Sequence, residues 1–331
     1  MHALDQRRRK ENLVIDQQVR AAASKPGFGF LTIAIGADRY LKQAEILSLS
    51  LRRNMPGVPI AIVSDSDRLK PHCDLLLPVD RSMPIATAQK LLLDVYSPFD
   101  ETLFIDSDCV AVRDFSDQIA RIRQFPFSPV IQTLTPPDGT DEYFADLGMA
   151  LRQVGGSAFP KFNGGVYFFR RGDASKAVFA LARDYFRHYR DYGIKPFDRG
   201  GPGDETVIGL ALARLGMLDL YDDGGRLMRT PTGLRGRLLI DPVKGACSFE
   251  RAEGMVHPAI CHFAGPYLLT PEYRLAEIAL RTGISQAKLS GLTKARATCG
   301  ALAARLMRLA RYRVDGVRKR VDRMLVTGGG K

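Results

Sequence analysis

Apolar and polar residues alternate along the first hundred residues in blocks that predict strands and helices in turn. Residues 27–36 (GFGFLTIAIG) and 58–65 (VPIAIVSD) are apolar runs with the length of buried strands. Between them, residues 37–54 place apolar side chains at the spacing of one helix face. Residues 88–99 predict a further helix, and residues 102–108 (TLFIDSD) predict a third strand. Strands that alternate with helices in this way are typical of a parallel α/β sheet.

The second half of the chain is less regular. Residues 136–160 are rich in Pro, Gly and acidic residues and predict a loop or lid. Residues 162–171 predict a strand that follows a glycine pair, and residues 205–215 predict a helix. We expect an α/β domain with a central, mostly parallel sheet flanked by helices. The expected parts are a basic N-terminal extension (1–26), this domain (27–280) and a basic amphipathic helical tail (281–331).

The third predicted strand ends in two carboxylates, Asp106 and Asp108. Side chains alternate along a strand, so both are expected to point to the same side. Two close negative charges are costly unless a cation lies between them, and carboxylate oxygens are the ligands that Mg²⁺ and Mn²⁺ prefer. Ligands of parallel α/β sheets bind at the carboxyl ends of the strands. We therefore expect the functional site at this end of the sheet, where Asp65 also closes the second strand.

Composition narrows the class of protein. No run of about 18 apolar residues predicts a membrane span, and the polar N-terminal residues lack the apolar segment of a secretory signal. The five cysteines are scattered and show no C-x-x-C spacing. This pattern favours a reduced, cytoplasmic compartment, and it indicates neither a zinc knuckle nor a disulfide framework.

The net charge of +12 arises almost entirely in the tail. Residues 281–331 carry 13 of the 48 Lys and Arg residues and only two acids, so the rest of the chain is nearly neutral. A neutral body with a basic tail is not the profile of a nucleic-acid-binding domain. Apolar residues of the tail, among them Leu302 and Leu306, follow helical spacing. A basic amphipathic helix of this kind is typical of segments that lie on anionic membranes; a helix packed on the body is the alternative.

Five segments in the same order give the chain a family resemblance. They are ADRYLKQAEILSLSL (37–51), AQKLLLDVYSPFDETLFIDSD (88–108), FNGGV (162–166), GDETVIGLAL (203–212) and HFAG (262–265). Together they resemble the nucleotide-sugar glycosyltransferases of the GT-A fold, in particular the glycogenin-like and lipopolysaccharide galactosyltransferase-like family 8 group. The resemblance implies a Rossmann-like nucleotide-diphospho-sugar transferase domain. It also implies transfer of a sugar from a nucleotide sugar, with UDP as the nucleotide, to a glycan or lipid-linked acceptor with retention at the anomeric carbon.

The same resemblance implies a metal site and a nucleotide site. Asp106, Asp108 and His262 would hold Mn²⁺ or Mg²⁺, which as a Lewis acid neutralises the leaving diphosphate. Tyr40 would lie against the base. The residues implied in donor binding are Tyr40, Asp65, Lys90, Asp106, Gly164 and Gly165.

Two further segments would surround the donor sugar and supply the catalytic residues Asn163, Asp204 and Glu205. The glycines beside Asn163 let the backbone approach the sugar closely. The family has Gln where this chain has Glu205. The additional carboxylate fits hydrogen bonds to sugar hydroxyls, or a base acting on the acceptor hydroxyl, which is a feature of inverting enzymes.

Each of these residues also has a purely structural interpretation. Tyr40 fits the apolar face of a helix, Asp65 the cap of a turn, and Lys90 a solvated helix surface. The glycine pair fits a turn before a strand. Asp204 fits the N-cap of the helix that follows, and His262 fits a half-buried residue at the end of a strand.

Two other functions fit part of the sequence. Asp106 and Asp108 match the D-x-D-x-[TV] motif of haloacid-dehalogenase-like phosphatases, with Asp222 and Asp223 as a later acidic pair. That motif belongs on the first strand of its domain, whereas two strand–helix units precede it here. A non-catalytic membrane-surface protein fits the tail alone. We combine the tail with the catalytic prediction and expect a cytoplasmic enzyme, peripheral on the membrane, that acts on a lipid-linked or envelope acceptor.

Overall fold

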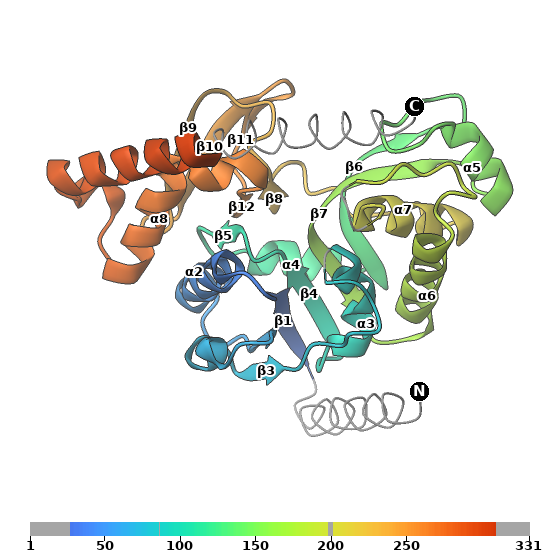
Figure 1. The fold of residues 1–331 in the computed structure, drawn as a ribbon, viewed down its shortest axis with the longest axis horizontal. Coiled ribbons are helices and arrows are strands. Elements are labelled where there is room, and N and C mark those ends of the chain that lie inside the picture. The colour runs from blue at the N-terminus through green and yellow to red at the C-terminus, as the bar shows by residue number, and fades with distance from the viewer. Residues whose placement is uncertain (1–26, 86, 198–200, 309–331) are drawn as a thin grey trace, which may run out of the picture.

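A six-stranded sheet with the order β3-β2-β1-β4-β7-β6 forms the centre of the protein (Figure 1). The computed structural model describes residues 27–85, 87–197 and 201–308. The strands of this sheet are β1 (Phe28–Ile33), β2 (Ile60–Val63), β3 (Leu75–Leu77), β4 (Glu101–Ile105), β6 (Phe127–Thr135) and β7 (Phe159–Arg170). β3, β2, β1 and β4 are parallel, and β7 and β6 add antiparallel pairs. The predicted mostly parallel α/β sheet is thus confirmed.

Seven labelled helices and two small sheets complete the described fold. The helices are α2 (Asp38–Asn54), α3 (Leu93–Tyr96), α4 (Ser116–Ile122), α5 (Leu147–Val154), α6 (Asp173–Arg187), α7 (Asp204–Arg214) and α8 (Pro271–Thr282). One small sheet consists of β5 (Cys109–Ala111), β12 (Ile260–His262) and β8 (Met228–Arg229), and the other of β9 (Arg235–Asp241), β10 (Ala246–Arg251) and β11 (Gly254–Val256). Short 3₁₀ helices span Asp67–His72, Thr87–Leu92, Gly265–Leu269 and Gln286–Lys288.

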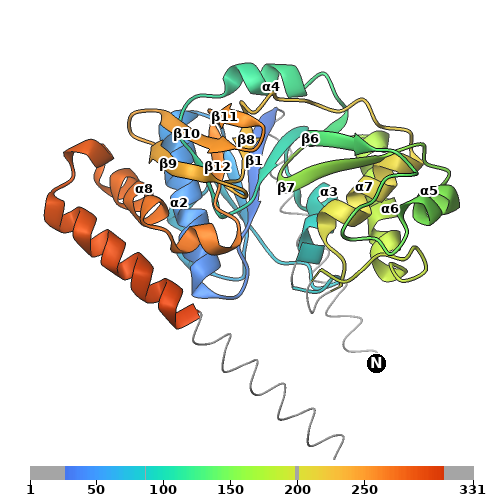
Figure 2. The ribbon, with the colours of Figure 1, turned by 90° about the horizontal axis from the view of Figure 1, so that it is seen from above.

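Strand alternation divides the core into two layers. Leu31 and Phe104 face one side of the sheet and pack with α3, α5, α6 and α7. Phe30 and Leu103, their neighbours in sequence, face the other side and pack with α2 and α4. Figures 1 and 2 show α5, α6 and α7 together on one side, and α2 and α8 with the small sheets on the other. Continuous apolar strands are buried on both faces because both faces are covered.

Three expectations about local structure were wrong. Residues 136–160 are not only a loop, because they contain α5, which Asp146 caps and which Gly155 ends in the left-handed conformation at φ 69°. The helix expected over 88–99 is a 3₁₀ segment followed by the single turn α3. The glycine pair lies inside the twelve-residue strand β7 and not in a turn before it.

The described part of the tail is a helix over 291–308 that has two different faces. Ala297 and Ala301 are buried, while Leu302, Leu306 and Met307 are more than half exposed. The boundary expected at residue 280 falls inside α8. The expected N-terminal extension and the tail beyond residue 308 lie outside the described residues. In the part of the chain that the structure describes, no helix combines the length and apolar character that a membrane span requires.

Candidate active site

Strand register brings three distant segments together at the end of β4. Ile105 pairs with Val166, and the backbone N–H of Asp106 donates to the Gly165 carbonyl at 2.9 Å. β12 runs antiparallel to β5, and the backbone N–H of Phe263 donates to the Asp108 carbonyl at 3.0 Å. The D-x-D segment, the glycine pair and the end of β12 therefore form one cluster.

His262 joins the two carboxylates of the D-x-D segment. Its Nε2 lies 3.0 Å from Asp108 Oδ1 and 3.8 Å from Asp106 Oδ2. Asp108 Oδ1 is buried and, apart from this 3.0 Å contact with His262 Nε2, has no hydrogen-bond partner among the described residues. A buried oxygen of this kind is costly unless a cation occupies the space in front of it.

The other ring nitrogen of His262 is already engaged. Nδ1 lies 2.7 Å from Asn163 Oδ1, which can only accept, and 3.1 Å from Thr230 Oγ1. When Nδ1–H donates to Asn163, Nε2 keeps a lone pair that faces the carboxylates, which is the arrangement of metal-binding histidines. The donor set of two carboxylates and one imidazole fits Mn²⁺ or Mg²⁺. Asn163 acts here as a positioning residue for His262.

Cys109 is a residue that sequence reasoning did not place at this site. A ligand atom of each of Asp108, Cys109 and His262 lies within 4.8 Å of the others. Burial raises the pKa of the Cys109 thiol well above its usual range, and a neutral thiol is a poor metal ligand. The carboxylates and His262 remain the fitting ligands.

Lys90 neutralises the inner side of the cluster. Its Nζ lies 2.6 Å from Asp106 Oδ2, 3.3 Å from Asp204 Oδ2 and 3.1 Å from the Gly164 carbonyl. Burial lowers the pKa of Lys90, but Asp106 and Asp204 outweigh burial and raise it, so the ammonium stays charged. The interpretation of Lys90 as a solvated helix residue was wrong.

The two carboxylates of the D-x-D segment differ in their ionisation. Burial raises the pKa of Asp106, although Lys90 opposes the rise. Burial also acts to raise the pKa of Asp108, but the His262 ring and Lys90 outweigh it and the pKa is lowered. In turn, burial acts to lower the pKa of His262, and Asp108 raises it. Asp108 is therefore the ionised carboxylate beside His262 Nε2 that would bind a metal cation.

The start of α7 supplies two carboxylates, Asp204 and Glu205, that make different contacts. Gly203 holds the N-cap position without a side chain, and Asp204 Oδ2 accepts a hydrogen bond from the Tyr167 hydroxyl at 2.6 Å. The N-cap interpretation of Asp204 was wrong. Glu205 Oε1 accepts from the backbone N–H of Gly164 at 2.7 Å. Burial, followed by Asp204, raises the pKa of Glu205 to about 7.

Tyr167 was missed in the sequence, although its strand predicted burial. A buried tyrosine needs a partner for its hydroxyl, and Asp204 is that partner. Together with Lys90, it fixes the Asp204 carboxylate in place. Asp204 is thus a positioning residue at the wall of the site.

The glycine pair is required by close packing of side chains. A Cβ on Gly164 would lie 2.7 Å from both Asp204 Oδ2 and the Tyr167 hydroxyl. A Cβ on Gly165 would lie 2.6 Å from His262 Nδ1 and 3.0 Å from Asn163 Oδ1. Only glycine at these positions lets His262 and Asp204 approach the strand.

We expect Gly165→Ala to displace the His262 ring and weaken Mn²⁺ binding at least tenfold, because orientation of a ligating histidine typically changes metal affinity by about 10–100-fold. The matched control is Gly172→Ala, where a Cβ meets nothing within 4 Å and the backbone is extended. Calorimetric titration with Mn²⁺ compares the two variants. Equal Mn²⁺ affinity in both would show that His262 is not held as described.

Of the two residues predicted at the nucleotide base, Tyr40 lies in the first turn of α2, which follows β1, and Asp65 follows β2. Tyr40 is 37% exposed, and the Arg39 guanidinium lies 4.6 Å from its ring centre, so its interpretation as a core residue was wrong. Asp65 Oδ1 accepts from the backbone N–H of Gly36 at 3.1 Å, while Ser66 caps the following 3₁₀ helix. The turn-cap interpretation of Asp65 was therefore wrong as well. Among the described residues, no hydrogen bond or ion pair joins either residue to the D-x-D segment.

The acidic pair required by a phosphatase has a local structural role. Asp223 is buried, accepts from the backbone N–H groups of three nearby residues and pairs with Arg229 at 2.7 Å. The D-x-D segment follows β4 and not the first strand. Neither feature supports a haloacid-dehalogenase-like site.

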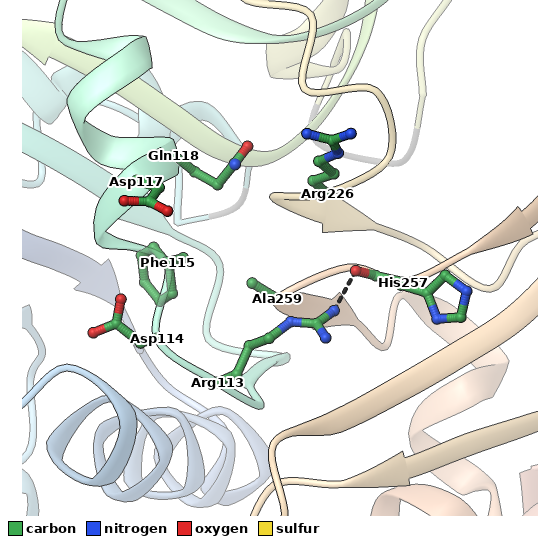
Figure 3. Close-up of a pocket in the computed structure, with 8 residues that line it drawn as sticks. All are labelled: Arg113, Asp114, Phe115, Asp117, Gln118, Arg226, His257 and Ala259. Carbon is green, nitrogen blue, oxygen red and sulfur yellow. Dashed lines mark hydrogen bonds between the residues drawn. The ribbon is translucent and has the colours of Figure 1, made fainter.

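A separate surface cavity of about 270 Å³ lies at the opposite end of β5 and β12 (Figure 3). Arg113 follows β5 and Ala259 precedes β12, whereas Asp108 and His262 lie at the other ends of these strands. Figure 3 shows Arg113 donating to the carbonyl of His257. Cations and carboxylates both line this cavity, so its charge favours no particular ligand.

Comparison with known proteins finds similar solved structures. The chain is similar to the galactosyltransferase LgtC in complex with donor and acceptor sugar analogs, at 17% identity over 72% of this chain and 87% of that chain, with a TM-score of 0.46. It is similar to the bifunctional glycosyltransferase WbbM at 12% identity, over 72% of this chain and 46% of that chain, with a TM-score of 0.45. It is also similar to mouse xyloside xylosyltransferase 1, at 12% identity over 62% of this chain and 87% of that chain, with a TM-score of 0.39. No protein-family model and no curated protein matches the chain. The function of the site is accordingly argued from the residues of this chain.

Proposed function

We propose that this protein is a metal-dependent glycosyltransferase that moves a sugar from a UDP-sugar to a glycan or lipid-linked acceptor. The observation that carries the proposal is the convergence of Asp106, Asp108 and His262 around the buried Asp108 Oδ1. The five sequence segments of the glycosyltransferase resemblance support it, because four of them contribute side chains or backbone to this cluster.

The roles of the cluster residues follow from their contacts. Mn²⁺ or Mg²⁺ held by Asp106, Asp108 and His262 would supply the Lewis acid that neutralises the departing diphosphate. Asn163 orients His262 through Nδ1, and Lys90 holds Asp106 in place. Tyr40 and Asp65 would take the base and ribose of the donor, since both lie at the carboxyl edge of the sheet, and the glycine pair would lie beside the diphosphate and sugar.

Glu205 would act on the donor sugar through its charge. The transition state of glycosyl transfer carries positive charge at the anomeric carbon, and a fixed carboxylate stabilises such charge in a site that excludes water. The proposal includes retention of the anomeric configuration, as the sequence resemblance implies, with Glu205 in this electrostatic role. Proton NMR of the product anomer tests that part, and an inverted product would assign Glu205 the role of base.

Calorimetric titration with UDP, with and without Mn²⁺, tests the proposed function first. We expect binding that requires the metal, followed by UDP release from one member of a panel of UDP-sugars. If another nucleoside diphosphate binds in place of UDP, the proposed reaction stands and the donor is a sugar linked to that nucleotide. Absence of metal-dependent nucleotide binding would refute the proposal.

The described part of the tail supports an association with anionic membranes. The helix over 291–308 contains four Lys and Arg residues and no acid. It exposes Leu302, Leu306 and Met307 next to these cations. Arg308 donates to the carbonyl of Gly265, just beyond the His262 strand, so this helix passes close to the candidate site. A lipid-linked acceptor would then meet the site at the membrane surface.

We expect the triple substitution of Leu302, Leu306 and Met307 by Ser to weaken binding to vesicles of anionic phospholipid at least tenfold, since interfacial binding scales with the buried apolar area. UDP binding should be unchanged. Leu134→Ser, at an exposed leucine of β6, is the matched control. Vesicle cosedimentation that is the same for all three proteins would remove membrane association from the proposal.

A further inference from the structure

Two aromatic rings lie near the start of α7. A Cβ on Gly203 would be 3.7 Å from the Phe197 side chain, and Tyr143 shares a small cavity with Glu205. Tyr143 and Phe197 meet edge to face with ring centroids 5.8 Å apart. Lys161 Nζ lies 4.5 Å from the centre of the Tyr143 ring. We call Tyr143, Phe197 and Lys161 the aromatic platform. Tyr143, Lys161 and Glu205 line a cavity of about 10 Å³, room for one water molecule, so this part of the platform borders the candidate active site.

The platform is held by its backbone and by ion pairs. The backbone N–H of Lys195 donates to the Tyr143 carbonyl at 2.7 Å, and that of Phe197 donates to Gly201 at 2.9 Å. Lys161 pairs with the buried Asp141 carboxylate at 2.7 Å. Phe197 nevertheless remains 56% exposed. An apolar ring that is fixed in solvent beside a second ring and a carboxylate is typical of a ligand surface.

Different parts of β7 contact the metal-ligating cluster and the aromatic platform. Gly164, which binds the Glu205 carboxylate, adjoins Gly165 and the cluster of metal-ligating side chains. Lys161, three residues earlier on the same strand, belongs to the platform. A ligand on the platform would therefore lie nearer to Lys161, and the proposed donor diphosphate nearer to Gly165, along the same strand.

The chemistry of the platform suits one class of ligand. A pyranose ring has an apolar C–H face, which packs on aromatic rings, and a rim of hydroxyls, which bond to carboxylates and ammonium groups. Asp141, Glu142 and Glu205 outnumber Lys161 and Lys195, so the local charge is negative when Glu205 is ionised. Like-charge repulsion then disfavours phosphorylated sugars and uronic acids.

We propose that the aromatic platform is the acceptor subsite and that its ligand is an uncharged pyranose ring, whose reactive hydroxyl points to Glu205. This inference rests on the proposed function, because a subsite for the acceptor presupposes a donor at the metal cluster. It commits the acceptor to a glycan, or to a lipid-linked glycan that presents a sugar ring, and not to a protein hydroxyl.

Saturation-transfer NMR tests the platform directly. The protein with UDP and Mg²⁺ is mixed in turn with methyl glycosides of glucose, galactose, mannose and N-acetylglucosamine, and with methyl glucuronide as the charged probe. We expect a neutral glycoside to bind, with the largest transfer to protons of one ring face. Phe197→Ala should weaken this binding about tenfold, which is the size of a good aromatic contact, while Phe197→Tyr should retain it.

The controls separate the platform from the proposed function. UDP binding with Mg²⁺ should be the same in wild type, Phe197→Ala and Leu239→Ala, the last at an exposed leucine of β9. If UDP binds and no pyranoside binds, or if Phe197→Ala and Leu239→Ala bind the pyranoside equally, the platform is not the acceptor subsite and the proposed function stands. If UDP itself does not bind, the proposed function fails first, and with it the basis of this inference.

Discussion

Asp108→Asn should abolish the Mn²⁺-dependent binding of UDP while leaving the fold intact. The amide has the shape of the carboxylate, so packing around β5 is retained, but the charge that faces His262 Nε2 is lost. Among the described residues, the buried Asp108 Oδ1 has only its 3.0 Å contact with His262 Nε2, and the lowered pKa of Asp108 keeps the carboxylate ionised for a cation. Loss of a charged metal ligand should reduce UDP affinity by more than about 100-fold in the presence of Mn²⁺, beyond the effect of an outer-shell change.

Asp222→Asn is the matched control for this measurement. Asp222 is an exposed carboxylate whose bond is local, to the backbone N–H of Gly224. The Asp222→Asn variant should bind UDP as the wild type does. The same pair of variants examines the phosphatase interpretation, in which both acidic pairs would be required for hydrolysis of a phosphate ester. Metal-dependent UDP binding that survives in Asp108→Asn would remove the metal cluster from the proposed function.

Glu205→Gln should lower kcat by about 10²–10³-fold, the cost of removing one group that stabilises transition-state charge. UDP affinity should be unchanged, because the glutamine oxygen can still accept from the backbone N–H of Gly164. Glu253→Gln, at an exposed carboxylate of the small sheet, provides the control. Steady-state kinetics with the UDP-sugar identified above give the measurement, and an unchanged kcat would exclude Glu205 from catalysis.

The same substitution should change the pH dependence of activity and of stability. Burial raises the pKa of Glu205 to about 7 without metal, so activity should fall as pH drops and this carboxylate becomes protonated. A bound cation favours the ionised form and moves the acidic limb of the pH–activity profile to lower pH. Between the ordinary carboxyl pKa of 4.5 and about 7, the folded protein keeps a proton that the unfolded chain has released. The free energy of unfolding of metal-free protein therefore falls as pH rises through this window. Glu205→Gln should remove this loss of stability and raise Tm at pH 8, by about 2–4 °C for each kcal/mol regained in the free energy of unfolding.

Local sequence pattern was sufficient for much of the sheet and for one edge of the site. Apolar runs of strand length predicted β1, β2 and β4, and helical spacing predicted α2, because burial on both faces of a parallel sheet leaves a strong local signal. The two carboxylates were expected to face the same side from the period of a strand, but β4 ends at Ile105, and a turn in which the Cys109 N–H donates to the Asp106 carbonyl carries them instead. Both now lie within 4 Å of His262 Nε2.

The local sequence pattern could not predict which side chains pair with partners distant in the sequence. The sequence offered two interpretations for Lys90, Asp204 and His262, since each residue type suits a surface, a cap or a site equally well. Their partners come from segments up to about 150 residues away, so only the register of β7 with β4 and of β12 with β5 decided which applied.

The sequence by itself determined the parallel α/β class, the carboxylates at the strand end and the uneven distribution of charge, because each depends on neighbours along the chain. The tertiary structure alone decided that the glycine pair lies inside a strand against His262 and Asp204. It also decided that Tyr167 fixes Asp204 and that Tyr143 and Phe197 form a platform beside Glu205. These features depend on close approach between separate elements, and the free energy of such contacts is set by packing that no local pattern records.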